Sequence, residues 1–397
     1  MIDLLRQPGT VLLDAPRPDA DTGRRGALLF ADPVRQLAAH APGEVEPLLR
    51  DLDAALADGF HVAGMLSYEA GHALDASLAP PPADPAVPLA WFGIYATPTV
   101  LDAADVASCL DGLEAPAVRD IAFAWTRSDY TRAVASVRES IRAGDVYQIN
   151  LTAPFDFRLD GDPLALYSAL RSRQSAAYGA YATLHDAHVL SVSPELFFRV
   201  DSDGPSRRIT ARPMKGTAGR GESAEADAAL VDTLLSNPKD RAENLMIVDL
   251  LRNDLARVAE TGSVRVPALF EAERYETVTQ MTSTVAADLR SEVGVAEAMR
   301  ALFPCGSVTG APKLRAMEII GEVETRPRGV YCGAIGYASP GARGLGEAVF
   351  NVAIRTAVVD ASGSGRYDVG SGIVWDSEPD AEYAECLLKA RVLTDLV

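Results

Sequence analysis

Two spacings of apolar side chains alternate along the chain and predict many strands with helices between them. Spacings of three and four residues, typical of amphipathic helices, occur in residues 43–59, 128–144, 236–254 and 377–397. Short apolar or alternating runs that predict strands occupy residues 60–74, 89–98, 146–152, 187–193, 196–200 and 207–214. No strand–helix–strand repetition indicates a doubly wound sheet. The pattern therefore favours an α+β fold with largely antiparallel sheets.

Composition places the chain among soluble globular proteins. It has 397 residues, of which 48% are hydrophobic and 23% are charged, enough for one large domain or two ordinary ones. No run of 18 or more apolar residues predicts a membrane span, and residues 1–10 lack the features of a secretory signal. The four cysteines are scattered without a C-x-x-C pair, so we expect a reduced protein of the cytoplasm.

The net charge of −18 restricts the kinds of partner. It argues against nucleic acid and against anionic membrane surfaces, because both require a positive surface potential. An anionic substrate would need a locally positive site. The glycine-rich loop at 305–313 lacks the spacing of a phosphate-binding loop, so a nucleotide site of that type is not predicted.

The helix predicted for residues 236–254 turns two carboxylates toward its apolar face. Asn237 is a strong capping signal, and the apolar stripe includes Ile247. Counting back four and seven residues from Ile247 gives Glu243 and Asp240, so both acids lie along the inward stripe.

The segment 377–397 repeats this arrangement. Ser377 is placed to cap the helix, and Glu382, Glu385 and Lys389 are three and four residues apart, so they share a face. Carboxylates that face an interior need a cation or hydrogen bonds to replace their hydration. The plain alternative is a set of surface acids with an ordinary Glu385–Lys389 ion pair.

A divalent ion held by one carboxylate from each helix would account for both inward faces. Carboxylate and water oxygens are the ligands that Mg²⁺ prefers. Magnesium is favoured over zinc because no histidine or cysteine accompanies the acids. We therefore expect Mg²⁺ as the cofactor.

Two cationic residues stand in unusual surroundings. Lys215 lies in the Gly- and Pro-flanked stretch ARPMKGTAGR (211–220), which predicts a shaped turn rather than a helix surface. Arg355 lies in the apolar run 350–359, where a buried arginine requires an anion or a carboxylate partner. The residues alone leave open a salt bridge from Lys215 to Glu195 and a structural ion pair at Arg355.

Seven segments in a fixed order resemble the chorismate-utilising enzymes, which include anthranilate, aminodeoxychorismate, isochorismate and salicylate synthases. The segments are RPMKGT (212–217), DRAENLMIVDLLRNDLARV (240–258), GSVTGAPKLRAMEII (306–320), CGAIGY (332–337), IRT (354–356), GSGIV (370–374) and DAEYAE (380–385). The resemblance is dense over residues 125–397. It is weaker over residues 1–120, where GMLSYEAGHAL (64–74) is the main match.

The resemblance implies two large, mostly antiparallel sheets in a sandwich-like core with helices packed outside. It makes residues 121–397 the chorismate-binding catalytic domain, and residues 1–120 an N-terminal subdomain that contributes to a shared β core. It implies Mg²⁺ between the ring carboxylate of chorismate and two glutamates, Glu243 and Glu385. Two further acids, Asp240 and Glu382, would lie nearby.

The resemblance also implies a set of substrate contacts. Tyr337 and Arg355 would hold the second carboxylate, Lys389 would contact a carboxylate, and Glu195 would be a general acid. Backbone contacts are implied at Gly216, Thr217, Gly370, Ser371 and Gly372. Gln148 stands where isochorismate-forming members carry a lysine that activates water, and an amide cannot act as that base.

Lys215 is the residue that distinguishes among the related reactions of this family. A lysine immediately before Gly-Thr is typical of the aminodeoxychorismate synthases of this family. Anthranilate synthases typically carry alanine at the same position. The resemblance therefore implies conversion of chorismate and ammonia to 4-amino-4-deoxychorismate through a covalent Lys215 adduct. It also implies a separate glutamine amidotransferase subunit as the ammonia source. A pyridoxal-phosphate lyase would act on the product toward para-aminobenzoate and folate.

Three alternatives stay open at this point. The chain resembles enzymes that form anthranilate or 2-amino-2-deoxyisochorismate, and Lys215 is the feature against both. A chorismate-binding regulatory subunit without catalysis is the alternative of another class, and the filled catalytic positions argue against it. Tryptophan binding in the N-terminal half is left open.

Overall fold

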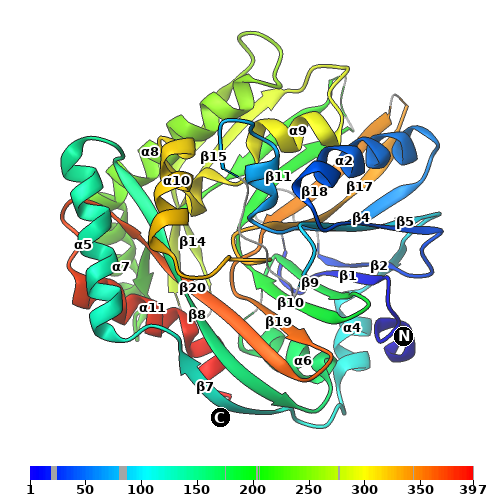
Figure 1. Ribbon diagram of the computed structural model, residues 1–397, viewed down its shortest axis with the longest axis horizontal. Coiled ribbons are helices and arrows are strands. Elements are labelled where there is room, and N and C mark those ends of the chain that lie inside the picture. Colours follow the sequence, from blue (N-terminus) through cyan, green and yellow to red (C-terminus); the bar gives the residue numbers. More distant parts are fainter. Residues whose placement is uncertain are drawn as a thin grey trace.

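The computed structural model describes residues 1–397 except 19–24, 80–86, 175, 203, 205, 276–277, 343 and 397. Most of the proline-rich stretch APPPADPAVP (79–88), which predicts a loop, therefore lies outside the described residues. Within the described part, the strands form two sheets of ten strands each, and every pair of neighbouring strands is antiparallel. Figure 1 shows both sheets running through the centre of the molecule.

We call the two sheets sheet A and sheet B. The strands of sheet A, in spatial order, are β16 (Gly310–Ala311), β8 (Gln148–Asp160), β20 (Ser364–Ile373), β19 (Thr356–Asp360), β10 (Ala187–Ser193), β9 (Tyr178–Thr183), β1 (Thr10–Ala15), β2 (Gly26–Phe30) and β6 (Thr99–Leu101), with β7 (Ala117–Phe123) on β8. Those of sheet B are β13 (Met214–Gly219), β15 (Val278–Asp288), β12 (Arg208–Arg212), β11 (Leu196–Asp201), β18 (Gly344–Val352), β17 (Ala334–Gly341), β4 (His61–Leu66), β5 (Ala90–Tyr95) and β3 (Arg35–Ala39), with β14 (Arg265–Arg274) on β15.

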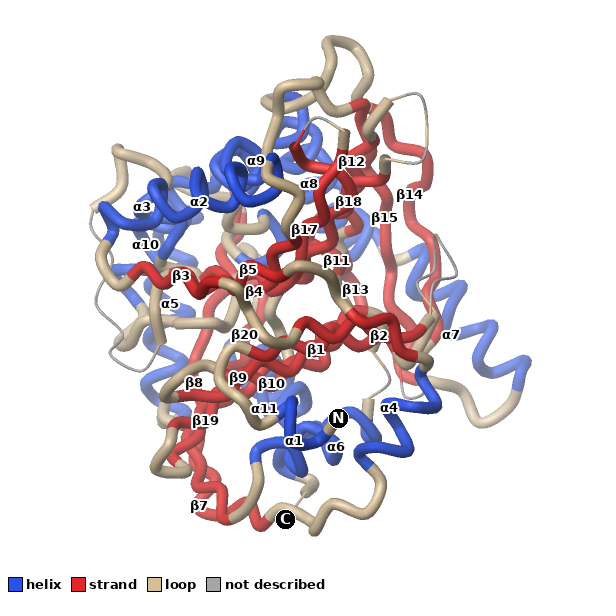
Figure 2. The backbone as a smooth tube through the Cα atoms, turned by 90° about the vertical axis from the view of Figure 1, so that its right-hand side faces the viewer, coloured by secondary structure: helices blue, strands red, loops and turns tan. Residues whose placement is uncertain are grey.

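The N-terminal strands belong to both sheets. Strands β1, β2 and β6 form one end of sheet A, and β3, β4 and β5 form one end of sheet B. Figure 2 shows β3, β4 and β5 lying above β1, β2 and β9. Segments far apart in sequence therefore share the same two layers.

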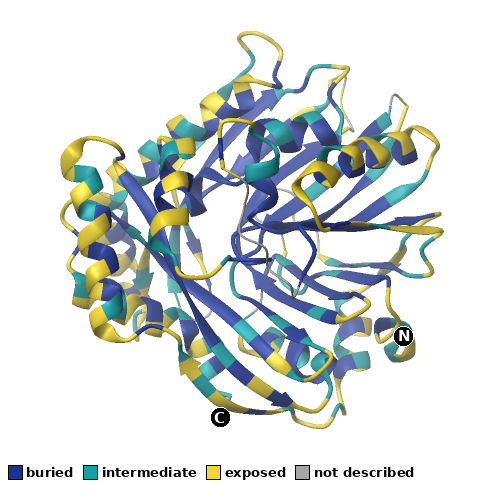
Figure 3. Cartoon of the chain, viewed as in Figure 1, coloured by how far each residue is buried: buried dark blue, intermediate teal, exposed yellow. Residues whose placement is uncertain are grey.

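Helices cover the outer faces of the sheets. Against sheet A lie α1 (Ile2–Leu5), α4 (Ala103–Leu110), α5 (Arg127–Ala143), α6 (Pro163–Arg173) and α11 (Pro379–Thr394). Against sheet B lie α2 (Pro42–Ala57), α7 (Ala224–Ser236) and α8 (Pro238–Ala256), and α9 (Val295–Leu302) packs on α2 and α8. Helix α10 (Lys313–Val323) follows the short η1 (Gly306–Val308) and β16. The remaining helix, α3 (Ala70–Ala73), follows β4. Figure 3 shows buried strands in the interior and exposed outer helix faces.

The predicted α+β fold with two large antiparallel sheets and outer helices is confirmed. The four helices predicted from spacing are present as α2, α5, α8 and α11. Ser128 or Asp129 is predicted to cap the helix at 128–144, and Ser377 the last helix; both of these predictions are wrong. Helix α5 is capped by Thr126, which shares reciprocal hydrogen bonds with Asp129, and α11 begins at Pro379 after Glu378 rather than at Ser377. Short polar side chains cluster at both sites, so composition alone does not fix the capping residue.

No helix of the described residues is long and apolar enough to cross a membrane. The apolar side chains instead form the core between the sheets and under the helices. Burial of this kind is the main favourable term in folding.

A buried arginine joins the two halves of the chain next to the longest strand pairing. Arg328 donates to the carbonyl oxygens of Val308, at 2.7 Å, and Asn150, at 2.6 Å, and pairs with Glu324 at 2.6 Å. The backbone N–H of Arg328 donates to Glu69 at 2.6 Å. The loop that leads to β16 is thereby fixed against β8.

Replacing this arginine should destabilise the protein strongly. Arg328→Met leaves the Glu324 carboxylate buried without its cation, and we expect the free energy of unfolding to fall by about 3–5 kcal/mol. Arg326→Met is the matched control, because Arg326 pairs with Asp156 at the surface, and its removal should cost about 0–1 kcal/mol. Urea unfolding of both variants measures the difference. Equal losses would contradict the role given to Arg328.

Candidate active site

Lys215 of sheet B reaches sheet A at Gly372. A Cβ atom at position 372 would come within 3.3 Å of the Lys215 Nζ and 2.4 Å of the Gln148 Nε2. Because Gly372 has no side chain, the lysine amine and the Gln148 amide approach the backbone of β20 from opposite sheets. The three residues, far apart in sequence, therefore meet at one point.

The backbone conformation of Gly216 sets the direction of the strand that carries Lys215. Its φ of +88° is in the left-handed region, and a Cβ there would lie 3.1 Å from the Cβ of Asp240. The backbone at Gly216 thus rests against the start of α8. The next residue, Thr217, is exposed and its hydroxyl donates to Gln280 at 3.3 Å.

Glu195 is the buried carboxyl of this region. It is 3% exposed, and its Oε1 accepts a hydrogen bond of 2.6 Å from the Ser307 hydroxyl. Burial raises the pKa of Glu195 from 4.5 to about 7, although the Ser307 hydrogen bond, the Lys215 charge and the Met214 N–H act in the opposite direction. A carboxyl with this pKa exchanges protons at neutral pH, which suits a general acid.

Arg355 differs from the sequence-based expectation in its backbone. It lies at a bend between β18 and β19, with a φ of +52°, rather than inside a strand. Among the described residues it forms no ion pair, so the structural ion pair left open by the sequence is not found there. Burial lowers the pKa of Arg355, while electrostatic interactions with three tyrosines and with Glu195 act in the opposite direction.

The tyrosines around Arg355 are Tyr331, Tyr275 and Tyr367. The Tyr367 hydroxyl is buried and has no hydrogen-bond partner in the described structure. A largely buried guanidinium without a carboxylate, beside an unpartnered hydroxyl, is a site prepared for an anionic group.

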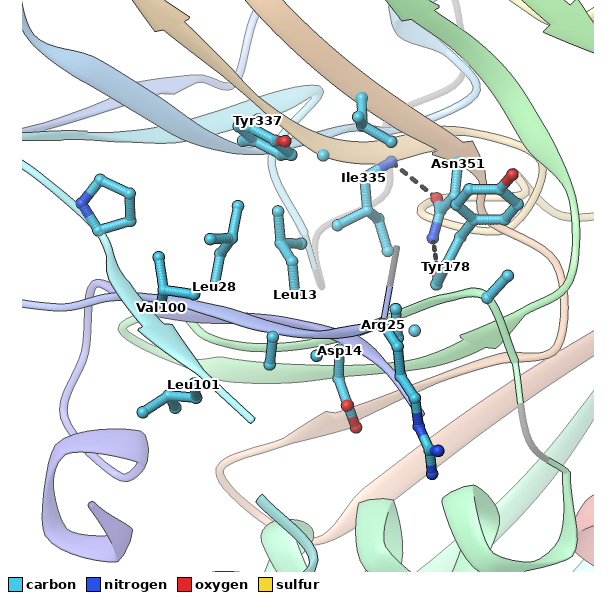
Figure 4. A pocket seen from close by; sticks show the side chains of 18 of the residues that line it. Leu13, Asp14, Arg25, Leu28, Val100, Leu101, Tyr178, Ile335, Tyr337 and Asn351 are labelled. Atoms are coloured by element: carbon cyan, nitrogen blue, oxygen red, sulfur yellow. Dashed lines mark hydrogen bonds between the residues drawn. The ribbon is translucent and has the colours of Figure 1, made fainter. Parts of the chain in front are cut away.

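Tyr337, expected beside Arg355, faces elsewhere. Its hydroxyl donates to Glu347 at 2.6 Å, and it lines a cavity of about 440 Å³ between β1 and β2 on one side and β17 and β18 on the other. Figure 4 shows this cavity, with Ile335 and Asn351 also on its wall. The tyrosine of this region that interacts electrostatically with Arg355 is Tyr331, just before the CGAIGY motif, and no sequence pattern singles it out.

The inward acids of α8 lie near the acids of α11. Asp240 interacts electrostatically with Glu385, and Glu243 with Glu382, across the two helices. Burial raises the pKa of both Asp240 and Glu243, so their negative charge is incompletely compensated by the protein. The Glu382 carboxylate accepts a hydrogen bond from Ser377 at 2.7 Å.

Lys389 occupies the other end of this acidic region. Its Nζ pairs with Glu385 at 2.7 Å and donates to the carbonyl oxygen of Gly370 at 2.8 Å. The Glu385–Lys389 ion pair considered as an alternative is therefore present. Burial alone would raise the pKa of Glu385, but the charges of Lys389 and Lys215 lower it overall.

The hydroxyl of Ser371, one of the expected substrate-binding residues, faces the core. It forms a hydrogen bond of 2.9 Å with the Tyr130 hydroxyl in the core under α5 and α11. Only the backbone of Ser371 remains available to a ligand. At Gly370, a Cβ would lie 2.7 Å from the Leu151 carbonyl oxygen, so this position also requires glycine.

The acidic side chains of α8 and α11 offer oxygen atoms as the ligands for a metal ion. Among the described residues no three His, Cys, Asp or Glu side chains lie close enough together to enclose a metal ion by themselves. Mg²⁺ commonly takes one or two protein carboxylates and completes its shell with water and substrate oxygens. The residues present therefore fit a magnesium ion shared with an anionic ligand and do not fit a closed zinc centre.

Comparison with known proteins connects this geometry to one family. The family model for chorismate binding enzyme matches residues 19–395. The chain is 44% identical over 271 residues to aminodeoxychorismate synthase of Streptomyces griseus, an alignment that covers 68% of this chain and 36% of that protein. It is 42% identical over 264 residues to anthranilate synthase component 1 of Methanothermobacter marburgensis, covering 66% of this chain and 55% of that protein.

A solved structure supports the same relationship. Anthranilate synthase component I from Streptococcus pneumoniae TIGR4 superposes with a TM-score of 0.75 at 27% identity, covering 94% of this chain and 93% of that one. The matches to the curated relatives span about one third to somewhat over half of the length of those proteins. The fold, the family model and the ordered motifs agree, and the chain therefore belongs to the chorismate-binding enzyme family.

Proposed function

We propose that this enzyme converts chorismate and ammonia to 4-amino-4-deoxychorismate, with Lys215 as the nucleophile. The observation that carries the proposal is the position of the Lys215 Nζ at Gly372, among Gln148 and the charges of Glu195 and Glu243. Relatives named aminodeoxychorismate synthase and anthranilate synthase match at similar identity, so their names do not decide the reaction. The lysine is the distinguishing residue.

The proposed chemistry proceeds in two displacements. The neutral Lys215 amine attacks ring carbon 2, the two ring double bonds shift, and the 4-hydroxyl leaves as water with a proton from Glu195. Ammonia then adds at carbon 4, the double bonds shift back, and the Lys215 amine leaves carbon 2. The sum is chorismate plus ammonia giving 4-amino-4-deoxychorismate plus water.

Arg355 would hold the carboxylate of the enolpyruvyl side chain, with Tyr331 rather than Tyr337 beside it. The support is the guanidinium without an ion pair and the electrostatic contact with Tyr331. The backbone at Gly216, Gly370 and Gly372 would lie against the ring. These contacts orient the substrate so that carbon 2 faces the lysine amine.

Mg²⁺ would be held by Glu243 and Glu385, with Asp240 and Glu382 nearby, and would neutralise the ring carboxylate of the substrate. The support is the all-oxygen donor set and the raised pKa of Asp240 and Glu243. Lys389 would lie at the edge of this region, where it already compensates Glu385.

Gln148 argues against water as the second reactant. Its side chain is 1% exposed and its amide oxygen has no hydrogen-bond partner in the described structure, so it is available to a donor in the site. An amide cannot remove a proton from water at neutral pH. Ammonia needs no such base, and a separate glutamine amidotransferase subunit is the proposed source. A separate lyase would consume the product.

The lysine variant tests the assignment directly. Lys215→Ala should lower formation of 4-amino-4-deoxychorismate by about 100-fold or more, because the covalent route is lost. Product analysis with chorismate, ammonium and Mg²⁺ measures this, and thermal unfolding checks the fold. Arg208→Ala is the control, since it removes an exposed cation from β12, the preceding strand along the chain. Near wild-type turnover by Lys215→Ala, or anthranilate as the wild-type product, would refute the proposal.

The metal assignment predicts a response to Mg²⁺ that needs no turnover. Mg²⁺ should raise the thermal unfolding temperature of the wild type, because binding to the folded state stabilises it. Glu243→Gln and Glu385→Gln should each abolish most of that rise. Glu318→Gln, which alters an exposed ion pair on α10, should leave the rise intact. A rise that persists in both site variants would place the metal elsewhere.

The proton-donor assignment predicts a shift in the pH profile. Glu195 donates only when protonated, so kcat/KM should fall as the pH rises through about 7, the pKa of that carboxyl. The Ser307 hydroxyl favours the ionised form, so its removal raises the pKa of Glu195. Ser307→Ala should therefore move the basic limb to higher pH, and Ser307→Thr should restore it. If the basic limb of the pH profile did not move in Ser307→Ala, Glu195 would be excluded as the origin of that limb.

A further inference from the structure

A second arginine, Arg17, reaches the active-site region from the N-terminal end of sheet A. It follows β1, and its guanidinium lies 4.1 Å from the centre of the Tyr275 ring, just after β14 in sheet B. Its NH2 group lies 3.7 Å from Oε1 of Glu273. Arg17 precedes the segment that matches the family model, which begins at residue 19.

This contact is largely shielded from water. Tyr275 is 4% exposed and Glu273 is 8% exposed. An arginine stacks well on an aromatic ring because its guanidinium is planar and weakly hydrated, and the attraction grows when water is excluded. The contact therefore fixes the positions of the Arg17 guanidinium and the Tyr275 ring, unlike a solvent-exposed surface contact.

Tyr275 and Glu273 connect Arg17 to the catalytic elements. The Tyr275 hydroxyl lies 4.0 Å from the Sδ of Met214, the residue before Lys215, and Tyr275 is one of the tyrosines that interact with Arg355. The second oxygen of Glu273 lies 3.4 Å from Arg212, three residues before Lys215. One ring and one carboxylate thus lie between Arg17 and the region around Lys215 and Arg355.

We propose that Arg17 is a positioning residue of the active site. Stacked on Tyr275 and paired with Glu273, it holds the Tyr275 ring beside Arg355 and keeps that guanidinium directed at the substrate carboxylate. This role rests on the proposed function. Arg17 touches neither the nucleophile nor the proton donor, so its loss acts on substrate binding and spares the chemical steps.

Steady-state kinetics with chorismate and ammonium test the role. Arg17→Ala should raise the KM for chorismate about tenfold and leave kcat within about twofold. Arg17→Lys keeps the charge opposite Glu273 but loses the planar stacking, so its KM should fall between the two. Arg50→Ala is the matched control, because Arg50 is an exposed arginine of α2 whose ion pair in the described part of the chain is with Glu46 of the same helix, and it should change neither constant. A KM for Arg17→Ala within twofold of the wild type, or a loss confined to kcat, would overturn the proposal.

A double-mutant cycle asks whether Arg17 acts through the tyrosine. In a Tyr275→Leu background, Arg17→Ala should have little further effect on the KM, because the ring that transmits the effect is gone. Additive effects of the two substitutions would overturn the proposal. Thermal unfolding of each variant separates positioning from loss of the folded protein.

Hydrogen exchange tests the same connection without substrate. Arg17→Ala should accelerate exchange of the backbone amides around Tyr275 and Lys215 relative to Arg50→Ala. Unchanged exchange in those segments would refute the structural connection. If the wild type forms no 4-amino-4-deoxychorismate while the exchange result holds, the proposed function fails and the Arg17 contact stands.

Discussion

The arrangement of the site depends on one close approach between the two sheets, where the Lys215 amine meets the backbone of Gly372. Any side chain at position 372 would displace either that amine or the Gln148 amide. Both flanking strands are held by antiparallel pairing, β20 along its whole length against β8, and β13 against β15. The position of the amine is therefore set by two hydrogen-bonded sheets, which suits a nucleophile that must meet one ring carbon.

The charges around this point explain how an acidic chain can receive an anion. The protein carries a net charge of −18, yet the Arg355 guanidinium forms no ion pair among the described residues, and burial raises the pKa of Glu195 to about 7, so that this carboxyl is only partly ionised at neutral pH. On the other side, the acids of α8 and α11 leave negative charge that a cation would neutralise. A substrate with two carboxylates matches this division, one facing the arginine and one facing a cation.

Local periodicity predicts the helices and the inward-facing acids from the sequence. Contacts between residues far apart in the sequence depend on tertiary pairing and are not predicted in this way. The inward position of Glu243 follows from helical spacing alone. Tyr337 is expected beside Arg355, yet its hydroxyl donates to Glu347, while Tyr331, just before the CGAIGY motif, interacts electrostatically with the arginine; only the fold distinguishes two tyrosines so close in sequence. The hydrogen bond from Ser307 to Glu195 joins residues 112 positions apart, and no local pattern reports such a contact.

The proposed reaction requires a covalent bond between Lys215 and the ring of chorismate. The most direct measurement is intact-protein mass spectrometry after incubation with chorismate and Mg²⁺ in the absence of ammonium, followed by peptide mapping. We expect an adduct with the mass of chorismate less one water, located on Lys215 and discharged when ammonium is added. An enzyme that forms 4-amino-4-deoxychorismate but shows no adduct on Lys215 would contradict it.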